Sequence, residues 1–438
     1  MTTNECAEII AGLDIGTTKT CCIIGRPAGR EIEILGMGSS VTLGVRSGLI
    51  VDIYAATSSV CSAVKQANKM AGTAIEHVIL SASGSHVYGV DGYADIKIIN
   101  NEIKKEDVKQ VIEVAERSAM IKDRKTLHLL AQEFVIDNKF EVRDPLGMYG
   151  RKLSTNIHII STSAHAIRNA IKCVHLCSLE IRDVVFEQFA AAQSVLRENE
   201  RDLGVAVINI GAETTSIVIF SNGLVKHTCV LPIGGRYLTN DVSVGLKTSF
   251  NDAELIKKKH GFTDIRIIRG FDVMRVPSIM GKSKRMNKRV LGNILKPRTE
   301  EMFASIAREI SSLNLDRSLI SGIVISGGTA LMPGITDVAE LVTGLPARIG
   351  IPENICGLSN LVSSPIYATC IGLLAYEKNR KVKPDADKEK NCSTFRGKVS
   401  KLNSSVRYIF KRKKPNTDTS TRGCNGYIWR SSKKRSSN

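Results

Sequence analysis

The 438-residue sequence has no apolar run that approaches the ~18 residues of a membrane-spanning helix. Its longest apolar segment, residues 366–376, has the length of a buried core helix. The first five residues lack the basic start of a signal peptide, which predicts a cytoplasmic protein. A Walker-type phosphate loop is also missing. Gly281-Lys282-Ser283 resembles the end of one, but Val276 stands where the earlier glycine is required.

Cysteines at metal-ligand spacing are scarce. The 11 cysteines are odd in number, and several lie inside apolar, strand-like runs, where a free thiol behaves as a small hydrophobic side chain. Cys173 and Cys177 flank His175 and could suggest a metal site, but no second pair stands at ligand spacing. We therefore expect buried, reduced thiols.

The positive charge is not spread evenly over the chain. Residues 376–438 carry 19 Lys or Arg against 5 Asp or Glu, a balance of +14, whereas the whole chain carries +18. The body before residue 376 is therefore nearly neutral. A basic tail indicates an anionic partner, either a membrane surface or a nucleic acid.

A pattern of strand, glycine turn and two further strands occurs twice in the chain. The strand-like segments are residues 8–14, 20–25 and 31–35, and then 204–211, 215–220 and 224–229. This repetition predicts an internally duplicated α/β protein. Residues 84–163, with strand-like pieces around one helix at 104–119, predict a small α+β insertion. Further helices are expected at 52–71, 164–176, 187–198, 252–260 and 297–313, a helix after 334, and a basic loop at 282–289.

The first glycine turn indicates a phosphate site. The amides of Gly16, Thr17 and Thr18 can face one point and form an anion-binding nest. Lys19 adds a positive charge, and Asp14 at the end of the strand can hold a magnesium-bound water. Taken alone, the same residues could form an ordinary hairpin.

Two further turns make the signal more specific. A second one stands at the equivalent place of the second repeat, and it consists of Asn209, Gly211, Ala212, Glu213, Thr214 and Thr215. A third, Gly327-Gly328-Thr329, has glycines that let a nucleoside lie against the backbone. Two phosphate turns and a nucleoside turn in this order predict a nucleotide site.

The duplicated turns resemble the superfamily of actin, the Hsp70 chaperones and the sugar kinases, and the details resemble its bacterial cell-division family, FtsA. The resemblance covers residues 8–378. It is carried by residues 12–19, 127–134, 143–148, 232–241 and 326–334. The second and third of these stretches belong to the insertion, which is peculiar to that family within the superfamily. The resemblance implies a duplicated actin-like (ribonuclease H-like) two-lobe α/β fold with an inserted small α+β subdomain and a C-terminal amphipathic helix.

The resemblance also implies a division of the chain. We expect first-lobe core at 1–84 and 164–200, the insertion at 85–163, second-lobe core at 201–250 and 301–378, an outer subdomain at 251–300, a linker at 379–394, the amphipathic helix at 395–414 and a basic tail at 415–438.

ATP with magnesium is implied between the lobes, clamped by the two phosphate turns. Glu254 and Lys257 match the family's adenosine-contacting pair, although a solvated ion pair has the same spacing. Glu187 matches the acid that orients an attacking water, although it could simply cap a helix. The family's second turn normally begins with aspartate, and here Asn209 leaves one carboxylate near magnesium where two are usual. We expect ATP binding with slow or absent hydrolysis.

Apolar residues of the tail fall within about 100° of a helical wheel. They are Phe395, Val399, Leu402, Val406, Ile409 and Phe410, with Arg407, Lys411 and Arg412 among the basic residues outside the stripe. A basic amphipathic helix on a flexible linker predicts an interfacial membrane anchor, the alternative being a helix docked on the body. Residues 416–438, with basic residues around Tyr427 and Trp429, could bind nucleic acid or lie among lipid headgroups.

The leading interpretation is an actin-like ATP-binding protein that polymerises and tethers the FtsZ division ring to the cytoplasmic face of the cell membrane, peripherally, at the septum. The resemblance implies that the C-terminal peptide of FtsZ binds around residues 251–300, together with contacts to other division proteins. Nucleic acid is the less favoured partner. The alternatives are a small-molecule kinase, a chaperone, which would need a large domain after residue 378, and an actin-like protein with a nucleic-acid-binding tail.

Overall fold

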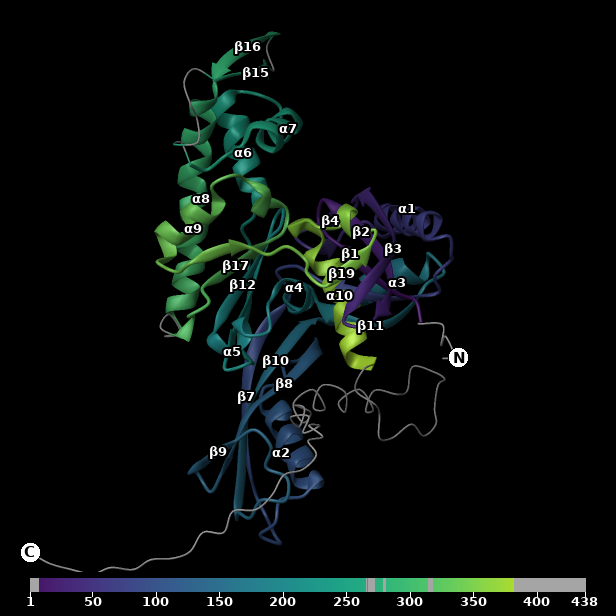
Figure 1. The fold of residues 1–438 in the computed structure, drawn as a ribbon, viewed down its shortest axis with the longest axis vertical. Coiled ribbons are helices and arrows are strands. Elements are labelled where there is room, and N and C mark those ends of the chain that lie inside the picture. Colours follow the sequence, from purple (N-terminus) through teal and green to yellow (C-terminus); the bar gives the residue numbers. More distant parts are fainter. Residues whose placement is uncertain (1–7, 265, 267–271, 279–280, 314–317, 382–438) are drawn as a thin grey trace, which may run out of the picture.

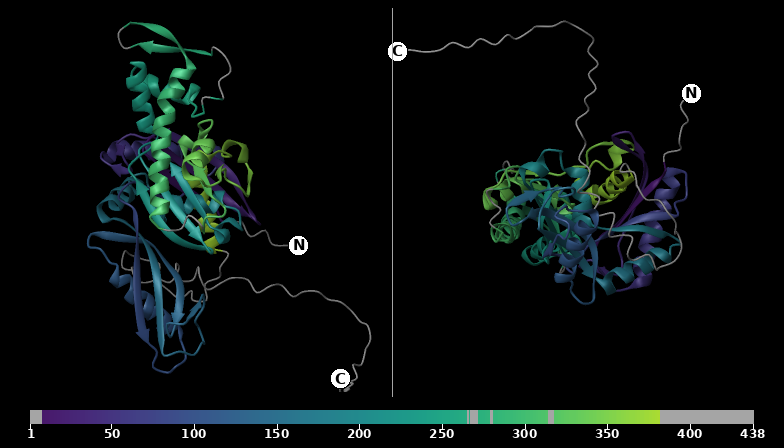
Figure 2. Two further views of the ribbon diagram at one scale, coloured as in Figure 1. Left: turned by 90° about the vertical axis from the view of Figure 1, so that its left-hand side faces the viewer. Right: turned by 90° about the horizontal axis from the view of Figure 1, so that it is seen from below.

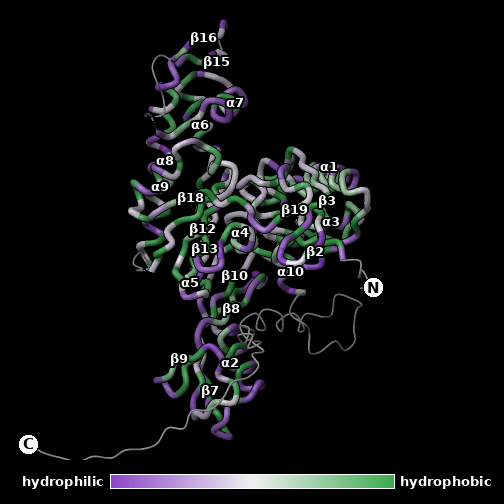
Figure 3. The backbone as a smooth tube through the Cα atoms, in the orientation of Figure 1, coloured by the Kyte–Doolittle hydropathy of each residue, from purple (hydrophilic) through white to green (hydrophobic). Residues whose placement is uncertain are grey.

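The computed structural model describes residues 8–264, 266, 272–278, 281–313 and 318–381. Two central lobes lie side by side, with a small subdomain at one end and a narrower extension at the other (Figure 1). The left view in Figure 2, turned by 90° about the vertical axis, also has these outer parts at opposite ends of the long axis. Hydrophobic segments follow the strands at the centre of the lobes (Figure 3). Most of the core of the described chain therefore lies in and around the two central sheets, and the small subdomain has a separate hydrophobic cluster.

A six-stranded sheet in the order β11-β6-β1-β2-β3-β19 forms the first lobe. Its strands are β1 (Ile10–Ile15), β2 (Lys19–Ala28), β3 (Glu31–Val41), β6 (His77–Ala82), β11 (Glu180–Phe186) and β19 (Ile355–Gly357). One face packs on α1 (Ile53–Ala71) and α3 (Ala164–His175), and the other on α10 (Ala368–Lys381). The Asp52 side chain starts α1 by accepting hydrogen bonds from two backbone amides, and Gly72 ends it with φ 65°.

A five-stranded sheet in the order β14-β13-β12-β17-β18 forms the second lobe. Its strands are β12 (Val205–Ile210), β13 (Thr215–Ser221), β14 (Leu224–Leu231), β17 (Ile323–Ser326) and β18 (Ala347–Ile349). In both lobes three antiparallel strands are followed by a parallel neighbour of the first strand, β6 beside β1 and β17 beside β12. The predicted duplication is confirmed.

Helices cover the second sheet on both faces. On one side lie α8 (Lys288–Ser311) and α9 (Ile335–Thr343), and on the other α4 (Glu187–Val195), while the short α5 (Glu200–Leu203) precedes β12. The extension consists of α6 (Gly235–Leu246), α7 (Phe250–His260), β15 (Val273–Ser278), β16 (Gly281–Asn287) and the start of α8 (Figure 1).

The helices α4 and α10 pack against each other between the lobes. Gly372 of α10 permits this close approach, because a Cβ added there would lie 2.0 Å from the carbonyl oxygen of Ala190 in α4. The helix α4 follows the first-lobe strand β11 and leads to the second lobe, so the chain passes between the lobes along α4, whereas α10 follows the first-lobe strand β19.

The small subdomain is an insertion between β6 and α3. Its sheet has the order β7-β10-β8-β9, with β7 (Tyr88–Lys97), β8 (Arg124–Ile136), β9 (Phe140–Val142) and β10 (Lys152–Ser163). The helix α2 (Lys105–Ser118) covers one face with Val108, Val111, Ile112 and Ala115, the side chains expected to be buried. The α+β character predicted for this segment is confirmed.

Three expectations about local structure are wrong. Residues 282–289 are not a loop, because residues up to Asn287 pair with β15 as the strand β16 and α8 begins at Lys288. The helix expected from Pro297 begins nine residues earlier, with Asn287 as its N-cap, and continues through that proline. Among the thiols, Cys61 and Cys177 form a disulfide with a Cα–Cα distance of 5.5 Å, since α1 packs beside α3.

Four other cysteines, Cys21, Cys22, Cys173 and Cys370, are free and buried as expected. Among the described residues, no helix combines the length and the apolar character needed to cross a bilayer.

Candidate nucleotide-binding site

The two predicted phosphate turns close hairpins of the same geometry. The Gly16 amide donates to the Lys19 carbonyl at 3.0 Å, and the Gly211 amide donates to the Thr214 carbonyl at 2.9 Å. The next residue pairs, Ile15 with Thr20 and Ile210 with Thr215, are also in equivalent register. Lys19 in the first turn therefore corresponds to Thr214 in the second.

Asp14 lies on β1, just before the first turn. The Ser81 hydroxyl on β6 donates to its Oδ1 at 2.6 Å. Burial raises the pKa of the Asp14 carboxyl, and the Ser81 hydrogen bond and the positive charge of Lys19 oppose this rise. The carboxylate is therefore part-buried and held in one orientation by Ser81, which suits a ligand of a cation.

Glu187 is the first residue of α4 and is only 8% exposed. The Ser216 hydroxyl on β13 donates to its Oε1 at 2.5 Å. Burial raises the pKa of Glu187 to about 8, and the negative charge of Asp14 adds to the rise while the Ser216 hydrogen bond opposes it. Glu187 follows β11 at the edge of the first sheet where Ser81 binds Asp14, so the two carboxyls lie near each other.

Asn209 completes this group from the second lobe. It pairs in register with Ser216 on one side and with Ser326 on the other. The side chains of Asp14, Glu187 and Asn209 thus belong to neighbouring strand ends of the two sheets. A buried carboxyl and a part-buried one, of which Asp14 disfavours the ionisation of Glu187, fit a divalent cation, because its charge would relieve that repulsion.

The third turn lies directly against the second. Gly327 ends β17 with φ 88°, and a Cβ added to it would lie 2.2 Å from the Asn209 Oδ1. Gly327 therefore permits contact between two turns, whereas we expected it to make room for a nucleoside. A Cβ added to Gly328 would meet no described atom within 4 Å, so Gly328 faces open space.

Glu254 and Lys257 on α7 form a part-buried ion pair with a distance of 2.7 Å between Lys257 Nζ and Glu254 Oε2. Lys257 is 11% exposed in its side chain, so the solvated ion pair considered from the sequence is wrong for this residue. Its ammonium also donates to the Gly235 carbonyl at 2.9 Å and to the Thr239 hydroxyl at 2.7 Å. Burial lowers the pKa of Lys257, and Glu254 opposes the change.

Gly235 is the point where the second turn, the third turn and the ion pair meet. Its amide donates to the Gly211 carbonyl at 2.9 Å. A Cβ added there would lie 2.7 Å from Thr329 Oγ1 and 3.5 Å from Lys257 Nζ. The structure therefore brings together the residues predicted to contact the nucleoside and the second phosphate turn.

Lys19 is held by the segment that precedes α10. Its Nζ donates to the Ile366 carbonyl at 2.9 Å and lies 4.1 Å from the centre of the Tyr367 ring. The neighbouring Pro365 carbonyl accepts from the Gly327 amide at 3.1 Å. This short segment therefore connects the first turn with the third.

Sequence reasoning missed a second contact between the turns. A hairpin of β4 (Val45–Arg46) and β5 (Leu49–Ile50) places Ser47 against the second turn, where its amide and hydroxyl donate to Glu213 Oε2 at 2.5 and 3.1 Å. Arg236 binds the other oxygen of Glu213 at 2.9 Å, and the Gly48 amide donates to Thr17 Oγ1 at 3.3 Å. No spacing in the sequence indicates the role of Ser47, because its partner Glu213 is 166 residues away.

The predicted membrane-binding residues, the linker at 379–394 beyond Lys381 and the basic tail lie outside the described residues. These membrane-binding residues are Phe395, Val399, Leu402, Val406, Arg407, Ile409, Phe410, Lys411 and Arg412.

Comparison with known proteins agrees with this architecture. The family model "Cell division protein FtsA" matches residues 206–372, and the model "SHS2 domain inserted in FTSA" matches residues 84–161. The chain is similar to the cell division protein FtsA of Pseudomonas aeruginosa, with 35% identity over 378 residues, 86% of this chain and 91% of the relative.

Two solved structures share the fold at low identity. A PilM–PilN type IV pilus biogenesis complex matches with a TM-score of 0.61 and 16% identity, covering 86% of this chain and 99% of that one. MreB5 of Spiroplasma citri bound to ADP matches with a TM-score of 0.50 and 14% identity, covering 85% of this chain and 97% of that one.

Proposed function

The chain belongs to the family of cell division protein FtsA, and from that membership we propose that it is an actin-like division protein that binds ATP between its lobes. The observation that carries the proposal is the meeting of the second turn, the third turn and the Glu254–Lys257 pair at Gly235. The ADP in the structure of the S. citri relative lends support, because that chain shares the fold.

The residues present fit ATP and magnesium. The amides after Gly16 and Gly211 would hold phosphate oxygens, and Asp14 would hold magnesium through water. Magnesium would neutralise phosphate charge when bound. Open space beside Gly328 suits the nucleoside, while Lys257 would exchange one of its three hydrogen-bond acceptors for the adenosine.

We propose that hydrolysis is slow or absent. A water-orienting base must be ionised, but the ligand-free Glu187, with a pKa of about 8, is largely protonated at neutral pH. Asn209 supplies an amide where the family normally has a second carboxylate, so it adds no charge to hold magnesium. The backbone amides that would bind ATP are therefore present, while hydrolysis lacks an ionised base at Glu187 and a second carboxylate at position 209.

Titration of the full chain with a fluorescent ATP analogue tests the site. Lys257→Met removes a charge-assisted donor and should weaken binding at least about tenfold. Lys258→Met is the matched control, because Lys258 is the next residue on α7 and its side chain is 69% exposed. Equal affinity of folded Lys257→Met and the control would count against the assignment of the adenosine site.

The cellular role that we propose is to polymerise and to tether the FtsZ ring to the cytoplasmic face of the membrane. Family membership and the basic amphipathic pattern of residues 395–414 support it. The C-terminal peptide of FtsZ would bind the extension, where Lys282, Lys284 and Arg285 are exposed on β16. A basic surface of this kind attracts an acidic peptide.

Co-sedimentation with anionic vesicles tests the tether. Leu402→Glu with Phe410→Glu should release the chain, and wild-type binding should survive several hundred millimolar salt in part, because apolar insertion is not screened. The control, Ser400→Glu with Ser404→Glu, adds the same charge on the opposite side of the helical wheel. A nucleic-acid-binding tail predicts instead that the first variant keeps RNA binding and that salt removes it.

A further inference from the structure

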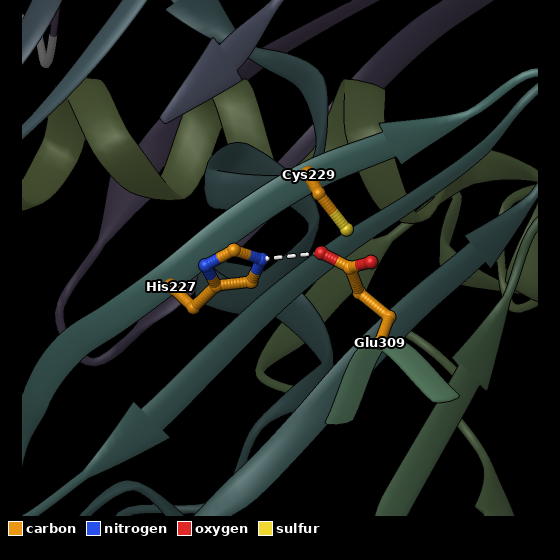
Figure 4. Close-up of side chains that lie close together, drawn as sticks. All are labelled: His227, Cys229 and Glu309. Atoms are coloured by element: carbon orange, nitrogen blue, oxygen red, sulfur yellow. Dashed lines mark hydrogen bonds and ion pairs between the residues drawn. The ribbon is translucent and has the colours of Figure 1, made fainter. Parts of the chain in front are cut away.

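Three side chains of different chemistry meet between β14 and α8 in the second lobe (Figure 4). His227 and Cys229 are two residues apart on β14, so both point to the same face of the sheet. Glu309 reaches them from the last turn of α8. The His227 Nε2 lies 2.9 Å from the Glu309 Oε1, and the three potential ligand atoms all lie within 4.8 Å of one another.

This set of donors suits a borderline-soft cation. An imidazole nitrogen, a thiolate and a carboxylate oxygen are the ligand types of Zn²⁺, whereas Mg²⁺ and Ca²⁺ prefer oxygen alone. Bond lengths of about 2.0–2.3 Å to a tetrahedral ion place ligand atoms roughly 3.3–3.7 Å apart. The present separations lie close enough for side-chain rotations to reach that geometry without a change in the backbone.

The partial exposure of the cluster decides how many ligands the chain provides. The side chain of His227 is 20% exposed and that of Glu309 is 30% exposed, so solvent reaches the three groups from one side. Glu309 interacts with both His227 and the Cys229 thiol, so it already holds the two other ligand groups beside each other. Three protein ligands with an open side are the arrangement of zinc sites that keep a water in the fourth position.

We propose that His227, Cys229 and Glu309 bind one Zn²⁺ ion, with water as the fourth ligand. On binding, the thiol proton passes to solvent and the imidazole proton moves from Nε2 to Nδ1, which frees the nitrogen that faces Glu309. The ion would fasten the edge strand β14 to α8. The next residue of β14, Thr228, faces the other way and contacts His158 of the inserted subdomain at 2.9 Å, so the ion would stiffen the strand on which that subdomain rests.

Competition between the full chain, without a polyhistidine tag, and a Zn²⁺-chelating dye measures the affinity. Wild type should hold one Zn²⁺ per chain at this site. Removal of a ligand in Cys229→Ala should weaken that binding more than about a hundredfold, since even changes behind the ligands cost 10–100-fold. Cys356→Ala is the matched control, a free and half-buried cysteine outside the cluster, and should bind as wild type does.

Co²⁺ substitution provides a second readout. Wild type and Cys356→Ala should show a thiolate-to-cobalt charge-transfer band that Cys229→Ala lacks. Glu309→Gln, which keeps the shape of the side chain, should retain the band at higher metal concentration, and it carries the test if Cys229→Ala fails to fold. Wild type without bound Zn²⁺, or equal affinity in wild type, Cys229→Ala and Glu309→Gln, would overturn the proposal. The Cys61–Cys177 disulfide is kept intact throughout.

Discussion

The two glycine turns have the same backbone but different side-chain chemistry. Thr20 and Thr215, which follow them, are both fully buried, and their hydroxyls bind the chain just after the third strand of each repeat, at Thr42 and at the Ile233 carbonyl. The polar residues that precede the turns differ, with Asp14 in the first lobe and Asn209 in the second.

The surroundings of these two polar residues differ as well. Ser81 beside Asp14 donates to its carboxylate, whereas the equivalent Ser326 beside Asn209 donates to the Ile208 carbonyl at 3.3 Å. The duplication therefore repeats the cradle of backbone amides but not the charge. The second carboxylate near Asp14 comes instead from Glu187, outside the repeated hairpin. Repeated folds can thus preserve the binding of an anion while the reactive groups become asymmetric.

The largest effect is expected at Gly327, where the third turn lies against the second. Gly327→Val would place a side chain on Asn209 Oδ1 at a residue with φ 88°, so we expect destabilisation of at least about 4 kcal/mol and loss of ATP binding. Thermal unfolding and ATP titration measure both. Gly328→Ala, whose added Cβ meets open space, should keep the stability of wild type. A Gly327→Val variant that still binds ATP would contradict the placement of this turn.

Glu187→Gln separates the charge of Glu187 from its shape. With the pKa raised from 4.5 to about 8, the folded state holds the proton more tightly than the unfolded state, so wild-type stability falls between pH 4.5 and 8. The ligand-free variant should match wild type near pH 4.5 and exceed it by an amount on the order of 4 kcal/mol at pH 8. Denaturant unfolding at both values checks this. If the stability of Glu187→Gln differed from that of wild type by the same amount at both pH values, the raised pKa of Glu187 would be refuted.

Asn209→Asp restores the symmetry of the two turns. A carboxylate facing the proposed magnesium site from the second lobe should raise Mg²⁺-dependent ATP hydrolysis about tenfold or more, because it would add charge stabilisation for the metal. Phosphate release at saturating ATP measures the change, with Asn209→Ser as a neutral control. Unchanged hydrolysis with intact nucleotide affinity would show that the missing carboxylate does not limit turnover.

The smallest expected effect concerns the contact between the lobes. Ser47→Ala removes the 3.1 Å hydroxyl contact with Glu213 and leaves the amide contact in place, so a loss of about 1 kcal/mol is expected. Thermal unfolding without nucleotide measures it. Ser47→Gly relieves the positive φ of 47° as it removes the same hydroxyl and should lose less. A larger loss in the glycine variant would mean that the turn itself, rather than the hydroxyl, stabilises the contact.

Local patterns predicted much of this fold. The apolar face of α2 and the glycine turns follow from spacing within a few residues, and the actin-like duplication follows from the repeated order of strands. Pro297 misled, because proline is common at a helix start but here lies inside α8. The Ser47–Glu213 contact and the Cys61–Cys177 disulfide join residues more than a hundred positions apart, so only packing reveals them.

The crossing of α4 and α10 at Gly372 has a mechanical consequence. If the lobes rotate relative to each other, we expect the axis of rotation to pass near the tight contact between these two helices, where atoms would travel least. Lys381, the last described residue, lies on the same helix, nine residues or about 13 Å beyond the crossing. A tether that continues from α10 would thus be attached near this axis. Rotation of the lobes would then displace the insertion and the extension, while the attachment point of the tether would move little.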